Sequence, residues 1–324
     1  MEKGIPCQDF VHIIEKKGVV VAALADGLGS ASKSEIASKI VVNYITNWLI
    51  KSTKDFFLGK ISKEQIIKEC RQAIENEAYK EKINLKDVDC TLLFIAIYGN
   101  KILGGQIGDG AICILKSDSA ELMFEPQKGE LANSTYTLFT KNIEEVFSLK
   151  CVDASKIEGI ILTSDGLEGD VYPANSKSVR KAAGTYVNFM LQENKEEIEN
   201  HIKELQEGNY YDDISIAILG RKNAKINLPD DPKWICLCGH KNSLNNSYCE
   251  KCHEDFIKVY RHVDFSKIDK YQYFREFNER NNNTSMVKRE RIIKIPNIPN
   301  EDLNNKRKIL KDESKTTIYG EKIM

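Results

Sequence analysis

The sequence lacks the long apolar runs that mark membrane-spanning and secreted chains. No stretch approaches the about 20 apolar residues that cross a bilayer, and Met1 to Asp9 contain no apolar signal segment. An excess of one charge is also missing, because 47 basic side chains balance 48 acidic ones and leave a formal net charge of −1. We therefore expect a cytoplasmic protein without a membrane partner, and its overall charge gives no reason to expect nucleic acid.

Disulfide spacing is absent as well, although the chain has nine cysteines. Five stand singly beside apolar residues, as buried thiols do: Cys7, Cys70, Cys90, Cys113 and Cys151. The other four lie within 17 residues: Cys236, Cys238, Cys249 and Cys252. A density of this kind is typical of a metal site.

The length of 324 residues suits one large domain with an appendage. Composition changes near residue 221, where a polar linker with Pro229 and Pro232 begins. The tail after residue 257 carries 16 basic and 10 acidic side chains, a net charge of +6, and we expect it to be partly disordered. The expected division is residues 1–221, a linker at 222–233, a zinc-binding module at 234–257 and a basic tail at 258–324.

Up to residue 221 the sequence alternates between strand-like runs and amphipathic helices, which predicts an α+β fold built around antiparallel sheet. Expected helices cover 32–49, opened by the capping box Ser32-x-x-Glu35, and 63–81, 178–192 and 196–206. Expected strands cover 10–15, 19–25, 91–98, 101–107, 111–115, 136–139, 146–149, 159–163 and 213–219. The aromatic stretch from Tyr260 to Phe277 predicts one docking helix in the tail.

Four aspartates lie at the ends of predicted strands: Asp26, Asp109, Asp165 and Asp212. Glycine follows the first three, which lets the backbone approach closely and frees a carbonyl to act as a ligand. Hard divalent cations such as Mg²⁺ and Mn²⁺ prefer carboxylate and carbonyl oxygens. Each Asp-Gly pair alone fits an ordinary turn, whereas strand ends that converge on one sheet edge could form a cation site.

The order of these motifs resembles the protein phosphatase 2C family of metal-dependent Ser/Thr phosphatases, and most closely a bacterial branch. The resemblance covers Gly4 to about Gly220 and rests on five stretches in the same order: Cys7-Gln8-Asp9, Ala25-Asp26-Gly27-Leu28-Gly29-Ser30, Gly108-Asp109-Gly110, Leu162-Thr163-Ser164-Asp165-Gly166-Leu167 and Tyr211-Asp212-Asp213-Ile214-Ser215. It implies an antiparallel β-sandwich flanked by helical layers. Because the chain begins almost at the first stretch, we expect one sheet-edge strand of the family to be missing.

The resemblance also implies a metal centre and a mechanism. It makes Asp26 the bridge between two Mn²⁺ or Mg²⁺ ions. The other implied ligands are the Gly27 carbonyl, Asp165 and Asp212, with Asp109 at a third ion. Asp9 would orient metal-bound water, so Asp26, Asp165 and Asp9 are the expected catalytic residues. Water held between two cations attacks phosphorus in line, and no protein nucleophile is needed.

Two departures from the family bear on activity. Gly4 stands where many members have the arginine that binds the substrate phosphate, and the candidate substitutes are Lys3 and Lys33. Leu28 and Ala31 occupy the region where many members have a histidine general acid. The leading alternative to an active enzyme is therefore a catalytically weak pseudophosphatase that binds phosphoproteins.

The cysteine cluster predicts one structural Zn²⁺ held tetrahedrally by four thiolates. Its pattern is Trp234-x-Cys236-x-Cys238-x₃-Asn242-x₆-Cys249-x₂-Cys252. The tryptophan, asparagine and last cysteine pair resemble small Ran-binding-protein zinc fingers and zinc ribbons. The first pair is closer than in that family, so His240 or His253 could replace a thiol. Lys241 and Lys251 are too few for an RNA-binding strip, and protein docking is expected instead.

Taken together, the sequence predicts a metal-dependent protein-serine/threonine phosphatase with a zinc-binding docking module. Its expected partners are phosphorylated Ser/Thr proteins and the Ser/Thr kinase that produces them, the latter by resemblance alone. A second alternative is an adaptor in which the zinc module and tail bind protein or RNA.

Overall fold

The computed structural model describes residues 6–129, 134–173, 178–207, 212–266, 268–283 and 316–323, the last range as backbone. The described residues form two compact units. The sandwich unit contains residues up to Asp230 together with 316–323, and the cysteine unit begins at Asp231 and is described to residue 283. Among the helices of these ranges, none has both the length and the apolar character of a membrane span.

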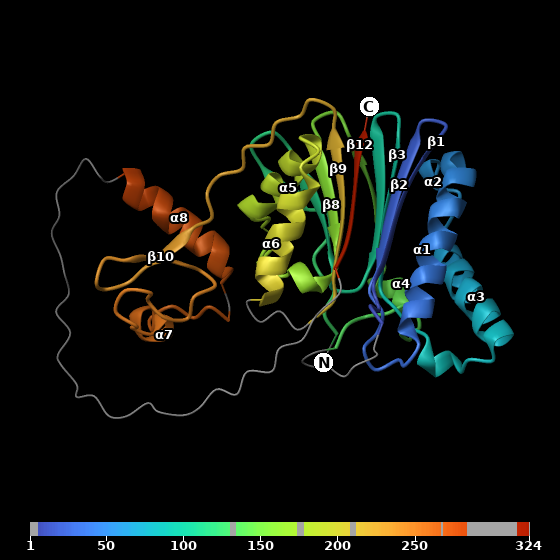
Figure 1. Cartoon of the computed structure of the whole chain (residues 1–324), viewed down its shortest axis with the longest axis horizontal. Coiled ribbons are helices and arrows are strands. Elements are labelled where there is room, and N and C mark those ends of the chain that lie inside the picture. Colours follow the sequence, from blue (N-terminus) through green and yellow to red (C-terminus); the bar gives the residue numbers. More distant parts are fainter. Residues whose placement is uncertain are drawn as a thin grey trace. The chain divides into compact units, whose positions relative to one another are not determined.

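The first sheet of the sandwich unit is antiparallel throughout, in the order β1-β2-β3-β4-β7 (Figure 1). Its strands are β1 (Phe10–Lys16), β2 (Val19–Ala25), β3 (Leu92–Tyr98), β4 (Lys101–Ile107) and β7 (Ser148–Asp153). Two-residue turns join β1 to β2 and β3 to β4. Lys17 and Gly18 both have positive φ, 56° and 74°, the conformation that tight hairpins require.

The second sheet has the order β12-β9-β8-β5-β6. Its strands are β5 (Ala111–Leu115), β6 (Ala120–Leu122), β8 (Gly159–Thr163), β9 (Ile214–Arg221) and β12 (Thr316–Ile323). All neighbours are antiparallel except β12, which pairs parallel with β9 along eight residues. Strand β12 thus forms one edge of this sheet. The sequence had placed this segment in a polar tail and had predicted that one edge strand of the sandwich would be missing.

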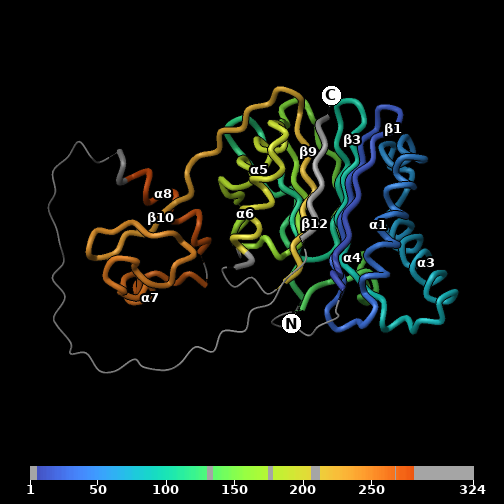
Figure 2. Tube along the Cα trace, in the orientation of Figure 1, coloured from blue at the N-terminus to red at the C-terminus, as the bar shows by residue number. Residues whose placement is uncertain are grey.

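The two sheets pack face to face, and helices cover their outer faces (Figure 2). Alternate residues of β2 therefore point to different cores. Val20, Ala22 and Leu24 face the second sheet, whereas Val21 and Ala23 face the helices. Because both faces are buried, the strand is a continuous apolar run, and each large side chain so buried stabilises the fold by about 1.5–3 kcal/mol.

The helical layers are α1 (Ser34–Lys51), α2 (Thr53–Phe57), α3 (Lys63–Glu81) and α4 (Ile143–Val146) on the first sheet, and α5 (Lys181–Leu191) and α6 (Lys195–Glu207) on the second. Short 3₁₀ turns cover Leu85–Asp87 and Asp165–Leu167. The α+β sandwich predicted from the sequence is confirmed.

Three local predictions were wrong. Helix α1 begins at Ser34, and its N-cap Lys33 makes no side-chain capping bond, so the capping box at Ser32 does not form. Residues 136–139 form turns and no strand. The predicted strand 146–149 spans an element boundary, because α4 ends at Val146 and β7 begins at Ser148.

The cysteine unit has a small hairpin and two helices around an aromatic core. Its elements are β10 (Lys233–Ile235), β11 (Lys241–Ser243), α7 (Phe256–Val259) and α8 (Lys270–Asn283). Trp234 and Phe274 are fully buried, and Phe256 and Tyr260 nearly so. Aromatic residues of the predicted docking helix thus pack inside the unit. The boundaries differ from those expected, since 222–230 belong to the sandwich unit, where Ile226 and Leu228 are buried.

Candidate active site

Five carboxylates lie at one end of the sandwich because of the strand directions. Strands β2 and β8 end there, β1 and β9 begin there, and the β4–β5 connection crosses there. The side chains concerned are Asp9, Asp26, Asp109, Asp165 and Asp212. Asp26 interacts electrostatically with Asp9, Asp165 and Asp212, and Asp165 interacts with Asp109. The structure thus brings together all five aspartates that the sequence singled out.

Burial and mutual repulsion hold protons on this cluster. Burial is the main reason that the pKa of Asp9 rises to about 7. The pKa of Asp165 also rises to about 7, through burial and then the charges of Asp109 and Asp212. Burial and the charges of Asp9 and Asp165 raise the pKa of Asp26 well above its usual range. These shifts belong to the cluster without cations, for which protons compete near neutral pH.

The cluster fits hard divalent cations. Asp9 is only 7% exposed. Its two oxygens and Asp165 Oδ1 have no hydrogen bond of good geometry to any described residue, although Asp26, Ser164 and Ser215 lie near Asp9. Buried carboxylates without such partners are costly unless cations neutralise them. Oxygen ligands of this kind suit Mn²⁺ and Mg²⁺.

The carboxylates are spaced more openly than the ligands of a single compact site. Within the described ranges, only the cysteine cluster brings three or more ligand atoms all within 4.8 Å of one another. The aspartates make pairwise contacts, Asp9 with Asp26 and Asp26 with Asp165.

The glycines that follow the aspartates let the strand ends approach one another. A Cβ on Gly27 would lie 2.7 Å from Ser34 Oγ and 2.8 Å from the Gln8 carbonyl oxygen. One on Gly110 would lie 2.6 Å from the Thr163 carbonyl oxygen. These distances are too short for any other residue without movement. The Asp-Gly pairs are therefore packing requirements of the site and not ordinary surface turns.

Several groups that position the carboxylates were not identified from the sequence. Thr91 Oγ1 accepts a hydrogen bond from the Asp26 backbone N–H at 2.8 Å. Thr135 Oγ1 donates to Asp109 Oδ1 at 2.7 Å, and the Tyr172 hydroxyl donates to the Asp109 carbonyl at 3.0 Å. Nothing in the local sequence marks these residues, because each meets its partner only in the folded chain.

Asp213, which follows the implied ligand Asp212, has a structural role. Its Oδ2 accepts the backbone N–H of Gln8 at 2.7 Å. This bond ties the segment that carries Asp9 to the strand end that carries Asp212. Asp213 thus anchors the first motif against the last.

The described residues at the second departure from the family pattern make backbone contacts of their own. Leu28 donates its backbone N–H to the Asp89 carbonyl at 3.0 Å and accepts one from Ala31 at 2.8 Å. The described histidines of the sandwich unit, His12 and His201, contact Thr46 and Asp170 instead of the carboxylates. Lys3 and Gly4 lie outside the described residues.

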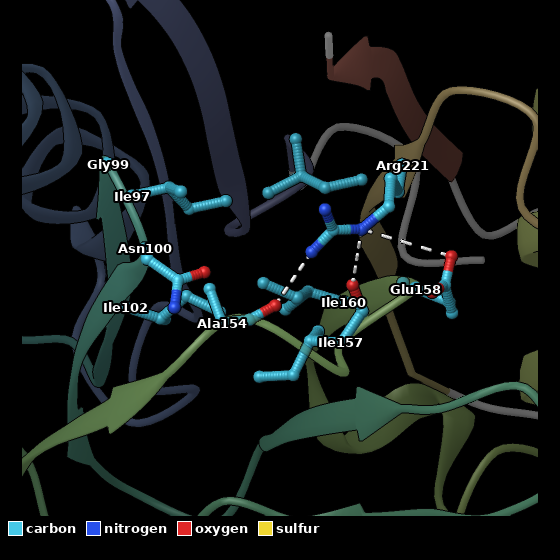
Figure 3. A pocket seen from close by; sticks show the side chains of 11 residues that line it. Ile97, Gly99, Asn100, Ile102, Ala154, Ile157, Glu158, Ile160 and Arg221 are labelled. Atoms are coloured by element: carbon cyan, nitrogen blue, oxygen red, sulfur yellow. Dashed lines mark hydrogen bonds and ion pairs between the residues drawn. The ribbon is translucent and has the colours of Figure 1, made fainter.

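The opposite end of the sandwich has a small cavity of about 100 Å³ between the sheets (Figure 3). Arg221 lies at this cavity, where its guanidinium donates to the carbonyls of Ala154 at 2.7 Å and Ile157 at 3.0 Å. These bonds join the end of β9 to the loop before β8. Asp165 and Asp212 lie at the other ends of β8 and β9. Arg221 is therefore structural and does not belong to the carboxylate site.

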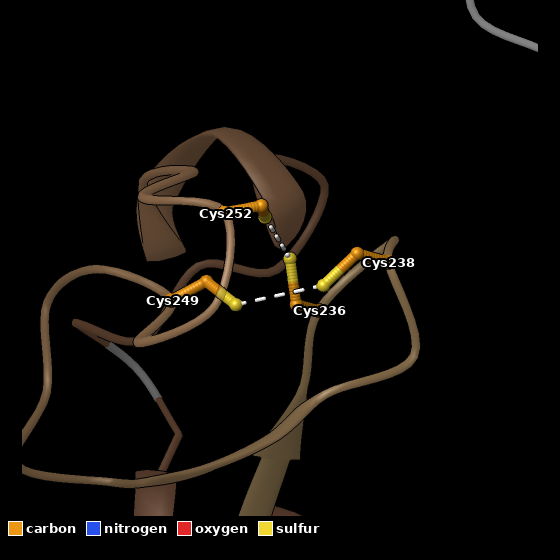
Figure 4. Close-up of side chains that lie close together, drawn as sticks. All are labelled: Cys236, Cys238, Cys249 and Cys252. Atoms are coloured by element: carbon orange, nitrogen blue, oxygen red, sulfur yellow. Dashed lines mark hydrogen bonds between the residues drawn. The ribbon is translucent and has the colours of Figure 1, made fainter.

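The four clustered cysteines converge in the cysteine unit (Figure 4). The Sγ atoms of Cys236 and Cys252 are 3.5 Å apart, and those of Cys238 and Cys249 are 3.6 Å apart. Thiolates at about 2.3 Å from a tetrahedral Zn²⁺ would be separated by about 3.8 Å. The geometry fits a four-cysteine zinc site.

Local backbone geometry accommodates the close first pair of cysteines. Gly239 adopts a positive φ of 83°, and its N–H bonds to the Cys236 carbonyl at 2.8 Å, which closes a tight knuckle. His240 lies beside Glu250 at 3.4 Å. Neither histidine that the sequence offered as an alternative ligand belongs to the group of four thiols.

The tryptophan and asparagine of the motif support the knuckles. Trp234 is fully buried and donates its indole N–H to the Asn246 carbonyl at 3.0 Å. The side chain of Asn242 accepts the Glu250 N–H at 2.9 Å and donates to the His240 carbonyl at 3.2 Å. It thereby connects the two cysteine pairs.

Comparisons with known proteins relate the chain to one family. Residues 1–207 match the family model described as Protein phosphatase 2C. No curated protein sequence matches the chain. Similar solved structures include a bacterial serine phosphatase, 13% identical, with a TM-score of 0.46 and coverage of 66% of this chain and 90% of that chain.

Two further solved structures are similar. One is the catalytic domain of the serine/threonine protein phosphatase PstP in complex with two manganese ions, 18% identical, with a TM-score of 0.44, covering 66% of this chain and 90% of that one. The other is the serine/threonine phosphatase of S. agalactiae, 21% identical, with a TM-score of 0.38, covering 51% and 76% respectively.

Proposed function

Since the chain belongs to the protein phosphatase 2C family and is by that membership a protein serine/threonine phosphatase, we propose that it hydrolyses phosphoserine and phosphothreonine with two divalent cations held by its clustered aspartates. The observation that carries this proposal is the convergence of five carboxylates, all with pKa values raised mainly by burial. A buried cluster of like charges is stable only when it binds protons or cations.

Each aspartate has a distinct proposed role. Asp26, the Gly27 carbonyl, Asp165 and Asp212 would hold two Mn²⁺ or Mg²⁺ ions, and Asp109 would hold a third. When bound, such ions supply Lewis acidity that yields a nucleophilic water for in-line displacement at phosphorus. Asp9 has two unsatisfied buried oxygens and would accept hydrogen bonds from water in the site, and so orient it.

A pseudophosphatase is the second candidate, and one observation favours it. In the described part of the sandwich unit, neither His12 nor His201 contacts the clustered carboxylates, so no histidine there is placed as the general acid. In the active enzyme, water would have to protonate the leaving alkoxide. The pseudophosphatase would bind cations and phosphoproteins without turnover.

The hydrolysis of p-nitrophenyl phosphate with Mn²⁺ separates these candidates. We expect turnover in the full chain and its loss to the metal-free background in D26N and in D165N. Asp118→Asn is the matched control, because Asp118 is exposed and pairs with Ser119. Calorimetric Mn²⁺ titration is the second measurement. Mn²⁺ binding without turnover would favour the pseudophosphatase, and no Mn²⁺ binding at millimolar supply would contradict both.

The cysteine unit is proposed to hold one structural Zn²⁺ through its four thiolates. Backbone N–H groups of Cys252 and Lys251 contribute to a pKa of about 6 for Cys249, despite the opposing effect of burial. A site closed by four protein ligands has no open position for catalysis. We therefore infer that this unit docks a protein partner. From the family, we also infer that the substrates are proteins that a Ser/Thr kinase has phosphorylated.

A further inference from the structure

The sandwich unit has three arginines. Arg71 donates to the carbonyls of Leu138 at 2.5 Å and Thr140 at 2.9 Å. Arg180 is 7% exposed at the start of α5, and Arg221 lies at the opposite end of the sheets. Because Gly4 stands where many family members have the phosphate-binding arginine, a lysine is a candidate for recognising the phosphate dianion beside the cations.

Lys128 is linked to the segments that carry two of the clustered carboxylates, Asp109 and Asp165. The Lys128 backbone forms an isolated antiparallel β-bridge with Thr135, and the Thr135 hydroxyl donates a hydrogen bond to Asp109. Its ammonium pairs with both carboxylate oxygens of Glu168, at 2.8 and 3.0 Å. Glu168 in turn donates its backbone N–H to the Asp165 carbonyl at 2.7 Å. The ion pair thus joins the segment beside Asp109 to the turn that follows Asp165.

Exposure and charge make the Lys128 ammonium reachable by an anion. The Lys128 side chain is 47% exposed, whereas that of Glu168 is 24% exposed. The Lys128 ammonium also interacts electrostatically with Asp109. Lysine binds phosphate as a compact point charge.

On the basis of the proposed function, we propose that Lys128 exchanges its partner Glu168 for the phosphate group of the substrate. Lys128 then fills the role that an arginine at the position of Gly4 has in many family members, and Glu168 holds the ammonium beside the site between turnovers. Lys33, the other lysine considered, is exposed, and its backbone N–H bonds to the Asp87 carbonyl at 2.8 Å. None of the described contacts links its ammonium to the carboxylates.

The test is calorimetric binding of inorganic phosphate to the full chain at saturating Mg²⁺. We expect K128Q to weaken phosphate binding roughly tenfold or more, the loss typical of a charged hydrogen bond, and K128R to retain most of it. E168Q should tighten binding, because it removes the competing carboxylate. K33Q is the matched control and should change the affinity less than twofold.

A purely structural ion pair makes a different prediction. It requires K128Q and E168Q to weaken phosphate binding alike, since both break the same contact, and that result would overturn the proposal. A larger loss in K33Q than in K128Q would also overturn it. With a phosphothreonine peptide, K128Q should raise KM and leave kcat within about threefold.

Mg²⁺ affinity, titrated separately in every variant, distinguishes failure of this inference from failure of the proposed function. If K128Q binds both Mg²⁺ and phosphate as the unchanged chain does, the proposed role of Lys128 is wrong and the proposed metal site stands. If the full chain binds no Mg²⁺, both the proposed metal site and the proposed role of Lys128 are wrong.

Discussion

At the residue scale, Gly27 and Gly29 lie two positions apart in the same motif but should respond differently to replacement by alanine. Gly27→Ala places a methyl group 2.7 Å from Ser34 Oγ, and we expect a loss of about 1–3 kcal/mol in the free energy of unfolding together with weaker Mn²⁺ binding. Gly29→Ala is the control, because no atom lies within 4 Å of its new Cβ. Urea denaturation and calorimetry measure both effects, and equal losses in the two variants would contradict the packing argument.

The carboxylates of the candidate site could be predicted from the sequence, whereas the groups that position them could not. The local sequence identifies Asp26, Asp109 and Asp165, because each lies at a predicted strand end and is followed by glycine. Thr91 and Thr135 are ordinary residues until the fold brings them 2.8 and 2.7 Å from their partners. Long-range hydrogen bonds of this kind leave no trace in the residue's own neighbourhood.

At the scale of elements, prediction succeeded where burial imposes a period. Helix α3 has the predicted bounds, residues 63 to 81, and strand β8 those predicted, 159 to 163. It failed where chain direction is set by distant contacts. The aromatic and β-branched residues at 136–139 favour a strand, yet backbone bonds such as that from Leu138 to the Cys90 carbonyl hold them in turns.

Strand β12 yields a testable prediction about the edge of the second sheet. Arg221 and Ile323 are register partners, and neighbouring strands lie about 4.8 Å apart, within the range of a disulfide. We expect the oxidised R221C/I323C variant to form that bond within one chain, as peptide mapping by mass spectrometry would show. The matched R221C/E321C variant, two residues out of register, should not. A bond between two chains would contradict pairing within the molecule.

At the scale of the whole molecule, the division into two compact units indicates separate sources of stability. The sandwich unit buries three apolar layers, one between its sheets and one beneath each helical layer. The cysteine unit buries a single aromatic cluster around Trp234. A core this small supplies little net stability, whereas a structural Zn²⁺ contributes about 10–16 kcal/mol of binding free energy to folding.

Loss of zinc should therefore unfold the cysteine unit and spare the sandwich unit. The chain has two tryptophans, so Trp48→Phe leaves Trp234 as the reporter of the cysteine unit. In that background, we expect C249S to shift Trp234 emission to the red and to retain Mn²⁺ binding within about twofold. Cys151→Ser is the control, because Cys151 is an exposed thiol on β7. Unchanged emission would show that the aromatic cluster suffices without metal, and loss of Mn²⁺ binding would show that the two units depend on each other.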